Sequence, residues 1–214
     1  MSTVGWVSED LHAWHVLRPL LDAGPYLPWS SGAMRPGGLV EVCNEILLGE
    51  RQRVLELGSG ASTLLFARLL DQQGGTLEAI EHDARWAAWV TAQLEREDLG
   101  GVARVTRASL RPSPHAAGEL PWYAADSLAE VLDDAPFDLL IVDGPPAHAD
   151  GHGLARYPAL GALAAHLTED AVVVLDDVIR PGETDVLERW EAETAFRFVR
   201  HEVQGIAIGR RPTD

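Results

Sequence analysis

From residue 53 onward, hydrophobic positions form short runs that alternate with helical patterns. Five runs are apolar and bounded by Gly, Asp or Pro, as is typical of buried strands. They are RVLELG (53–58), TLEAIE (76–81), ARVTRA (103–108), FDLLIVD (137–143) and AVVVLDD (171–177). Between the second and third runs, Trp86, Val90 and Leu94 form a stripe at four-residue spacing that predicts a packing helix over 83–97. The alternation predicts an α/β fold with a mostly parallel sheet and helices on both faces.

The end of the chain departs from this alternation. After a helical pattern at 183–194, the runs FRFVRHEV (196–203) and GIAIGR (205–210) follow each other too closely to enclose a helix. Parallel neighbours need a crossover of about a dozen residues or more, so these two strands should pair antiparallel. The sequence therefore predicts a sheet whose last strand is antiparallel.

The first 50 residues carry two further helical patterns. We expect one helix over 8–22 with Ser8 as its N-cap, and another over 36–50 with Pro36 in its first turn. The segment between them is rich in Pro, Gly and aromatic residues, which indicates a loop, either a passive connection or a lid over a site. The expected organisation is an N-terminal helical extension (1–50) on a main domain (51–214), together one globular unit.

The balance of acidic and basic residues excludes several classes of function. The chain has 33 acidic and 17 basic residues, which gives a net charge of −16. Every basic residue is an arginine, so the chain has no lysine. Schiff-base enzymes, pyridoxal enzymes and lysine-dependent phosphate sites are therefore excluded. An acidic chain also lacks the basic face that a binder of nucleic-acid phosphates needs. Small molecules or cations are the expected partners.

The sequence contains few signals that indicate a cellular compartment or a membrane location. Cys43 is the only cysteine, so no internal disulfide can form, and its place on an apolar helical stripe predicts a buried side chain. No stretch approaches the roughly 20 apolar residues that span a bilayer, and no signal peptide pattern is present. A soluble, cytoplasmic protein without a membrane partner is expected.

The most informative stretch is VLELGSGASTLLFARLL (54–70). Its strand delivers an acid, Glu56, to a tight Gly-Ser-Gly turn at 58–60, after which Ser62 and Thr63 open a helix. Glycines let the backbone approach a ligand closely, and a helix N-terminus offers free N–H groups to an anion. These residues predict a nucleotide-type ligand.

The next strand ends in Glu81, 21 positions after Gly60. A carboxylate there can bind the ribose hydroxyls of a dinucleotide or an adenosyl cofactor. A dinucleotide is disfavoured by Thr63, which stands where that fingerprint has Gly or Ala, and by Glu56, whose carboxylate suits a ligand ammonium group. An ordinary strand–turn–helix with an incidental glycine pair is the alternative.

A second group of candidates follows the later strands. Asp143 ends the fourth strand, and Asp176 and Asp177 end the fifth. The carboxyl ends of central parallel strands face the ligand crevice, and three carboxylates there call for a positive partner such as Mg²⁺. The alternative is that Asp143 opens a turn while Asp176 or Asp177 caps the helix near Pro181.

These motifs, in this order, resemble those of class I S-adenosylmethionine-dependent methyltransferases over about 54–210. The resemblance implies a Rossmann-like seven-stranded sheet with its last strand antiparallel. It also implies that Glu56 and the glycine turn hold the methionine portion with Ser62 near its carboxylate, that Glu81 takes the ribose hydroxyls, and that Ala108-Ser109 lies against adenine. The implied cofactor-binding residues are Glu56, Gly58, Ser59, Gly60, Ser62, Glu81, His82, Ala108, Ser109 and Asp143.

A sharper resemblance is to the metal-dependent O-methyltransferases of the catechol and caffeoyl-coenzyme A type. It implies that Asp143, Asp176 and Asp177 are ligands of Mg²⁺ or another divalent cation. The DGPP, ARYPAL and LDDVIRPGE phrases also resemble bacterial methyltransferase domain family 24. Catechol-type enzymes place a lysine base after the fourth-strand Asp, whereas this chain has Pro145-Pro146.

Several side chains are candidates for the missing base and for binding the substrate. His148 and His152, in the glycine-rich loop after Asp143, can accept a proton near neutral pH, and His148 is the preferred candidate beside Asp143. Arg156, at the start of a predicted helix, and Arg180 are expected either to bind an anionic substrate or to form salt bridges with nearby acids.

For the aromatic and histidine side chains elsewhere, the sequence allows two structural roles each. Trp29 and Met34 in the N-terminal loop either wall an apolar substrate or pack in the core. The helical spacing of Trp86 and Trp89 favours a core role over an adenine platform. His12 and His15, one helical turn apart, indicate a solvated face or an interface, and a homodimer is left open.

We therefore expect a methyltransferase domain at 51–214 that uses S-adenosylmethionine and a divalent metal to methylate a hydroxyl of a small molecule. A metal-independent N- or O-methyltransferase that uses Asp143 or a loop histidine is the first alternative. A dehydrogenase that uses NAD and a cofactor-binding module without catalysis are more remote ones.

Overall fold

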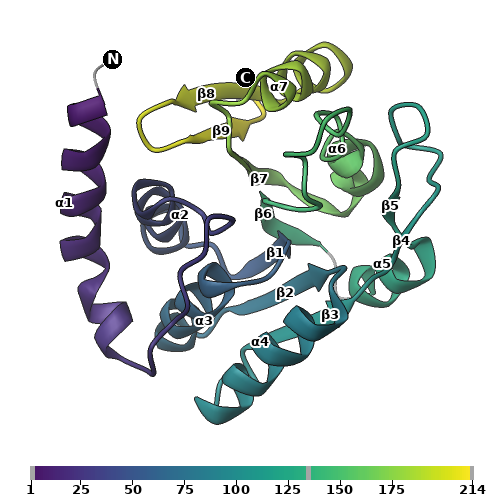
Figure 1. The fold of residues 1–214 in the computed structure, drawn as a ribbon. Helices are drawn as coiled ribbons and strands as arrows, with labels where there is room; N and C mark the ends of the chain where they lie inside the picture. Colours follow the sequence, from purple (N-terminus) through teal and green to yellow (C-terminus); the bar gives the residue numbers. More distant parts are fainter. Residues whose placement is uncertain (1–2, 134–135, 213–214) are drawn as a thin grey trace.

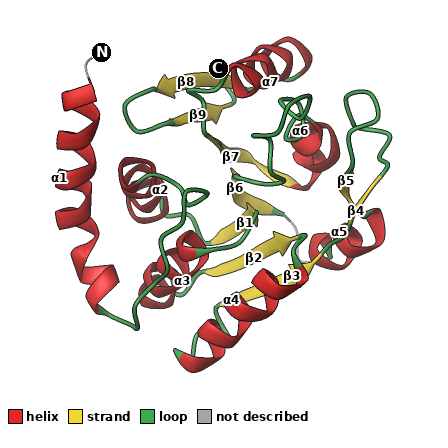
Figure 2. Cartoon of the chain, viewed as in Figure 1, coloured by secondary structure: helices red, strands yellow, loops and turns green. Residues whose placement is uncertain are grey.

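A seven-stranded sheet forms the centre of the protein in a computed structural model that describes residues 3–133 and 136–212 (Figures 1 and 2). The strands are β1 (Arg53–Leu57), β2 (Thr76–Glu81), β3 (Ala103–Arg107), β4 (Leu110–Arg111), β5 (Trp122–Tyr123), β6 (Phe137–Val142), β7 (Leu167–Asp176), β8 (Arg197–His201) and β9 (Ile206–Arg210). The helices are α1 (Thr3–Asp22), α2 (Pro36–Leu48), α3 (Ala61–Gln73), α4 (Ala84–Arg96), α5 (Ala125–Leu132), α6 (Pro158–Leu163) and α7 (Pro181–Glu193), with a 3₁₀ turn (Ala164–His166) after α6.

The strand order of the main sheet is β3-β2-β1-β6-β7-β9-β8. Strands β3, β2, β1, β6 and β7 are parallel, while β9 pairs antiparallel with both β7 and β8. The expected seven-stranded sheet with an antiparallel last strand is therefore confirmed. The order reverses between β1 and β6, which in an open α/β sheet opens a crevice at the carboxyl ends of these strands.

Helices cover both faces of the sheet, as predicted (Figure 1). Helices α2, α3 and α4 pack with one set of buried strand residues, and α5, α6 and α7 pack with the other. Side chains alternate between the two faces along a strand, so in β1 Val54 belongs to the first core and Leu55 to the second. This alternation turns Glu56 toward α3.

The N-terminal helix is longer than the sequence indicated. It begins at Thr3, so Ser8 lies inside α1 and the prediction of Ser8 as its N-cap is wrong. Leu17 and Leu27 of this region share a core with the strands. The buried Arg68 of α3 also holds this region, because its guanidinium donates to the carbonyls of Leu20 and Pro25 and pairs with Glu97 at 2.6 Å.

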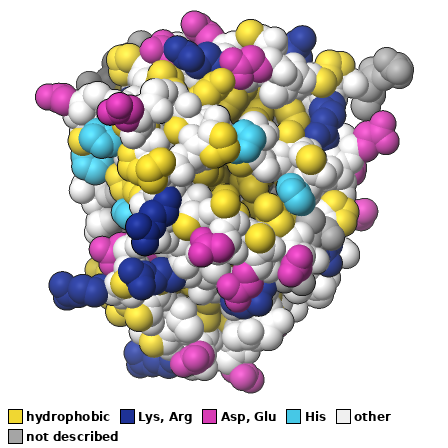
Figure 3. Space-filling model, turned by 90° about the vertical axis from the view of Figure 1, so that its right-hand side faces the viewer, with side chains coloured by type: hydrophobic (Ala, Val, Ile, Leu, Met, Phe, Trp, Pro, Cys, Tyr) yellow, Lys and Arg dark blue, Asp and Glu magenta, His cyan; other side chains and the backbone are white. Residues whose placement is uncertain are grey.

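The short β4–β5 hairpin and helix α5 were not predicted, and α6 begins at Pro158 rather than at Arg156. They lie together on one side of the molecule, where hydrophobic side chains gather with histidines among them (Figure 3). A hollow of about 400 Å³ on this side is lined by residues such as Trp122, Leu128 and Ala162. No helix in the described ranges is long and apolar enough to cross a membrane.

Candidate functional site

A glycine turn after β1 and the chain after β6 meet at the reversal of strand order. Gly58 has φ +90°, a left-handed conformation that favours glycine, and its N–H donates to the carbonyl of Ile80. A Cβ on Gly144 would lie 2.9 Å from the backbone N of Gly58. The two backbones touch here, so both positions need glycine.

Glu56 lies behind the glycine turn and is fully buried. Its two carboxylate oxygens accept hydrogen bonds from the hydroxyls of Ser62 and Thr63, each at 2.6 Å. The Thr63 hydroxyl in turn accepts the Gly60 N–H at 2.9 Å. Burial raises the pKa of Glu56 to about 7, although the two hydroxyl donors act against this shift. In this arrangement Glu56 fixes the turn and the first residues of α3.

Glu81 joins the ends of β1 and β2. One carboxylate oxygen accepts hydrogen bonds from the N–H and the hydroxyl of Ser59, at 2.9 and 3.3 Å. The other oxygen accepts the Asp83 N–H at 2.7 Å and lies 2.9 Å from Nδ1 of His82. Burial acts to raise the pKa of Glu81, but the hydrogen bonds from His82, Asp83 and Ser59 outweigh it and lower the pKa.

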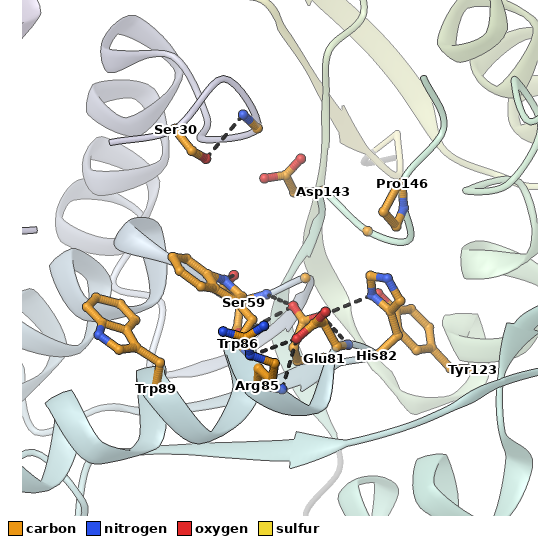
Figure 4. Close-up of a pocket in the computed structure, with 14 residues that line it drawn as sticks. Ser30, Ser59, Glu81, His82, Arg85, Trp86, Trp89, Tyr123, Asp143 and Pro146 are labelled. Carbon is orange, nitrogen blue, oxygen red and sulfur yellow. Dashed lines mark hydrogen bonds and ion pairs between the residues drawn. The ribbon is translucent and has the colours of Figure 1, made fainter. Parts of the chain in front are cut away.

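These residues border a cavity of about 690 Å³, which is large enough for a nucleoside-sized ligand (Figure 4). Figure 4 shows Trp86 and Tyr123 on opposite sides of Glu81, with Asp143 between Ser30 of the N-terminal loop and Pro146. The lining residues are Ser30, Gly32, Gly58, Ser59, Glu81, His82, Asp83, Arg85, Trp86, Trp89, Tyr123, Asp143, Gly144 and Pro146.

The structure brings together most of the candidate cofactor residues. Five of them line the large cavity: Gly58, Ser59, Glu81, His82 and Asp143. A smaller adjoining cavity of about 80 Å³ is lined by Gly60 and Ser62, together with Trp29 and Met34 of the N-terminal loop. Ser59, Trp86 and Asp143 border both cavities.

The remaining candidates lie elsewhere. Ala108 is fully buried, and neither it nor Ser109 is among the residues that line the two cavities. His148 is exposed and lines neither cavity, while His152 lines a separate hollow of about 540 Å³. The adenine contact of Ala108-Ser109 and the catalytic role of His148 therefore stay predictions.

The three aspartates after β6 and β7 lie together, as expected from the strand ends. One carboxylate oxygen from each of Asp143, Asp176 and Asp177 falls within 4.8 Å of the others. Helix α7 begins at Pro181 with Arg180 as its N-cap residue, and it has no side-chain cap. The capping alternative for Asp176 or Asp177 is therefore wrong.

A buried arginine lies among these aspartates. Nη2 of Arg156 is 3.0 Å from Oδ1 of Asp143 and 3.1 Å from Oδ2 of Asp177, and Nη1 donates to the carbonyl of Asp176 at 3.1 Å. Only 4% of the Arg156 side chain is exposed. Helix α6 begins at Pro158, so Arg156 precedes the helix in the loop after β6. Arg156 was expected either to bind an anionic substrate or to form salt bridges with nearby acids, and these contacts correspond to the salt bridges.

A second arginine and a buried glutamate complete the group. Arg180 pairs with Asp177, and its Nη1 lies 3.6 Å from Oε1 of Glu183. Glu183 is 1% exposed and lies 3.7 Å from Nη1 of Arg156, with no hydrogen-bond partner for its carboxylate among the described residues. Burial raises the pKa of Asp143 to about 6 and that of Asp176 well above its ordinary value, against the lowering effect of Arg156.

The sequence indicated no site role for Tyr123, and for Trp86 it favoured a core role over an adenine platform. Trp86 and Trp89 stack at 5.0 Å between ring centroids and pack against the core, but both also line the large cavity. Nε1 of Trp86 donates to the carbonyl of Ser59 at 2.5 Å. The position of Trp86 in the first turn of the helix that follows Glu81 was the available signal. Nothing in the sequence placed Tyr123 here.

Comparison with known proteins identifies the family of the chain. Residues 55–178 match the model of a family described as a methyltransferase domain. Among curated proteins the sequence has no match.

Solved structures resemble the whole chain at low sequence identity. The O-methyltransferase TomG from Streptomyces achromogenes, in complex with SAM, is 18% identical over 100% of both chains with a TM-score of 0.64. A Podospora anserina methyltransferase bound to SAH is 14% identical, over 96% of this chain and 88% of that one, with a TM-score of 0.63. An O-methyltransferase from Bacillus cereus in complex with SAH is 18% identical, over 95% and 90%, with a TM-score of 0.59. The chain therefore belongs to this methyltransferase-domain family, and its fold is that of the class I S-adenosylmethionine-dependent methyltransferases.

Proposed function

We propose that the protein transfers the methyl group of S-adenosylmethionine to a hydroxyl oxygen of a small molecule. The observation that carries this proposal is the position of Glu81, whose carboxylate lines a cavity that also reaches Asp143. Glu81 stands where a ribose would be bound, and its lowered pKa keeps it an acceptor of hydroxyl hydrogen bonds. The acidic, lysine-free composition supports a small acceptor over a nucleic acid.

The two cavities suggest how the cofactor would lie. Its ribose would meet Glu81, and its methionine portion would follow the glycine turn toward Ser62 in the smaller cavity. The N-terminal loop would close over this portion, because Ser30 and Gly32 line both cavities. Asp143 borders both as well, which would place it near the methyl group.

The chemistry asks little of the protein beyond orientation and proton removal. The acceptor oxygen uses a lone pair to form the bond to the methyl carbon, while the carbon–sulfur bond breaks and its electron pair stays on sulfur. The hydroxyl proton must go to a nearby base. Asp143 is the proposed base, because its carboxylate borders the cavities on the side of the β6 end.

The sequence analysis favoured a more specific version of this reaction, in which a divalent cation is bound by Asp143, Asp176 and Asp177. The oxygen ligands suit such an ion, and a bound ion would orient the acceptor and lower the pKa of its hydroxyl. However, Arg156 lies within 3.1 Å of carboxylate oxygens of both Asp143 and Asp177. As these side chains stand, the donor set does not fit an ion, so we derive no step through one and favour the metal-independent form.

Calorimetric titration separates the candidate functions. We expect heat of binding with S-adenosylmethionine and none with NAD, and the reverse result would favour the dehydrogenase. Transfer of a radiolabelled methyl group to members of a panel of hydroxylated small molecules should follow. Binding without transfer to any hydroxyl or amine in the panel would contradict the proposed reaction and favour a cofactor-binding module.

A further inference from the structure

We propose that Arg156 takes the place of a divalent cation at the carboxylate cluster and acts as the positioning residue for Asp143. The positioning role of Arg156 rests on the proposed function. The replacement of a cation by Arg156 concerns only the charges of the carboxylate cluster. The positive charge between the strand ends then belongs to the polypeptide and cannot be removed by a chelator.

The contacts of Arg156 carry the argument. Its Nη2 bridges the carboxylates of Asp143 and Asp177, at 3.0 and 3.1 Å. Its Nη1 donates to the carbonyl of Asp176, and its Nε donates to the carbonyl of Pro145 at 3.4 Å. All three guanidinium nitrogens are therefore directed at the segments that supply the three aspartates. A cation between Asp143 and Asp177 would have to displace a buried, charge-paired guanidinium.

A second set of contacts closes this arrangement. Asp177, Arg180, Glu183 and Arg156 form a ring in which acid and base alternate, and each neighbouring pair lies within 3.7 Å. Each guanidinium in the ring therefore has two carboxylate neighbours. Such a ring holds both terminal nitrogens of Arg156, Nη2 at Asp177 and Nη1 at Glu183.

The backbone around Arg156 is also held in place. A Cβ on Gly182, in the first turn of α7, would lie 2.5 Å from Cα of Gly153, so the loop that carries Arg156 packs directly against this helix. Ala155 beside Arg156 is buried. The guanidinium is thus held by the fold before any ligand binds, which is what a positioning role requires.

Metal binding to the unliganded wild-type protein tests this inference without any assay of transfer. We expect MnCl₂ to leave the Tm unchanged and isothermal titration with Mn²⁺ to give no saturable heat. If wild type binds one Mn²⁺ and Asp177→Asn abolishes that binding, the inference is overturned. Calorimetry with S-adenosylmethionine on the same sample tests the proposed function separately, so the two failures are distinguishable.

Removal of the guanidinium gives the complementary test. Arg156→Met leaves the carboxylates without their bridging charge, so we expect this variant to gain Mn²⁺ binding, seen as a rise in Tm of at least about 3 °C with MnCl₂. Arg156→Lys keeps the positive charge and should gain none. Arg18 pairs with Asp22 on α1 and its side chain is 71% exposed, so Arg18→Met is the matched control and should behave as wild type.

Activity assays add a readout that a purely structural role would not change. We expect wild-type transfer to be unaffected by EDTA, and Arg156→Met to lose activity at least about 10-fold in EDTA and to recover part of it with Mn²⁺. A folded Arg156→Met protein that binds no Mn²⁺ overturns the inference. If this variant does not fold, the Mn²⁺ titration of wild type decides.

Discussion

Glu81 reaches from the end of β2 to the glycine turn after β1, where its carboxylate accepts the Ser59 N–H at 2.9 Å. The same side chain holds the Asp83 N–H with its other oxygen, so one carboxylate fixes both turns that border the large cavity. A ligand hydroxyl that binds Glu81 would therefore find the surrounding backbone already in place.

Glu81→Gln should weaken binding of S-adenosylmethionine by about 10-fold or more, because a single amide oxygen cannot accept hydrogen bonds on both sides as the carboxylate does. Calorimetric Kd values measure the effect. Glu95→Gln, on the exposed face of α4, is the control and should leave the Kd unchanged. Equal affinity in Glu81→Gln and wild type would remove Glu81 from the cofactor site.

Gly144→Ala should destabilise the protein by about 2 kcal/mol or more and abolish cofactor binding. The added Cβ would lie 2.9 Å from the backbone N of Gly58 and against the buried hydroxyl of Tyr123, so the two chains that form the site would have to separate. Urea unfolding measures the loss of stability. Gly100→Ala has no heavy atom within 4 Å of the new Cβ and is the control. A Gly144→Ala protein as stable as this control would contradict the contact.

The stability of the unliganded protein should fall between about pH 4.5 and pH 7 because of Glu56. Burial raises the pKa of Glu56 in the folded state to about 7, so the unfolded chain loses this proton first as the pH rises. The folded state is then penalised by about 3 kcal/mol, a cost that is complete above pH 7 and absent below pH 4.5.

Glu56→Gln isolates this effect, because the other titrating groups are common to both proteins. The variant should be more stable than wild type at pH 8, and the difference should vanish near pH 4.5. Urea unfolding at several pH values measures it. Parallel stability curves for the two proteins would show that Glu56 does not titrate with a raised pKa.

Local pattern was sufficient to predict much of the fold. The buried runs of β1, β2, β6 and β7 are short, apolar and bounded by turn residues, and the structure contains each of them near the expected positions. Helix α4 begins at Ala84, where Asp83 accepts the N–H groups of Arg85 and Trp86 as an N-cap. Cys43 is buried as predicted, and burial raises the pKa of its thiol to about 12.

Elements without a strong pattern were missed. The β4–β5 hairpin has two residues in each strand, so it is too short to show a period. Ser8 has the residue type of an N-cap but lies inside a helix that starts five residues earlier. Cap preference alone cannot locate a helix end when tertiary packing extends the helix.

The candidate site could be predicted where its residues lie at strand ends. Asp143 and Asp177 follow central strands, so their proximity to each other is a consequence of the parallel sheet. Arg156 is 13 positions beyond Asp143 in an irregular loop, and only the folded path of that loop brings its guanidinium back. A loop arginine carries no periodic signal, so the sequence could suggest salt bridges for Arg156 but could not place its guanidinium between Asp143 and Asp177.

The pairing of β9 also affects how the chain can assemble during synthesis. Strand β8 precedes β9 in the sequence, but β9 lies between β7 and β8 in the sheet. Among the described strands, β8 pairs with β9 and not with β7. A nascent chain that has emerged only as far as β8 would leave the edge of β7 open and β8 without its neighbour. Until β9 pairs with it, the open edge of β7 would be a template on which strands of other chains could pair.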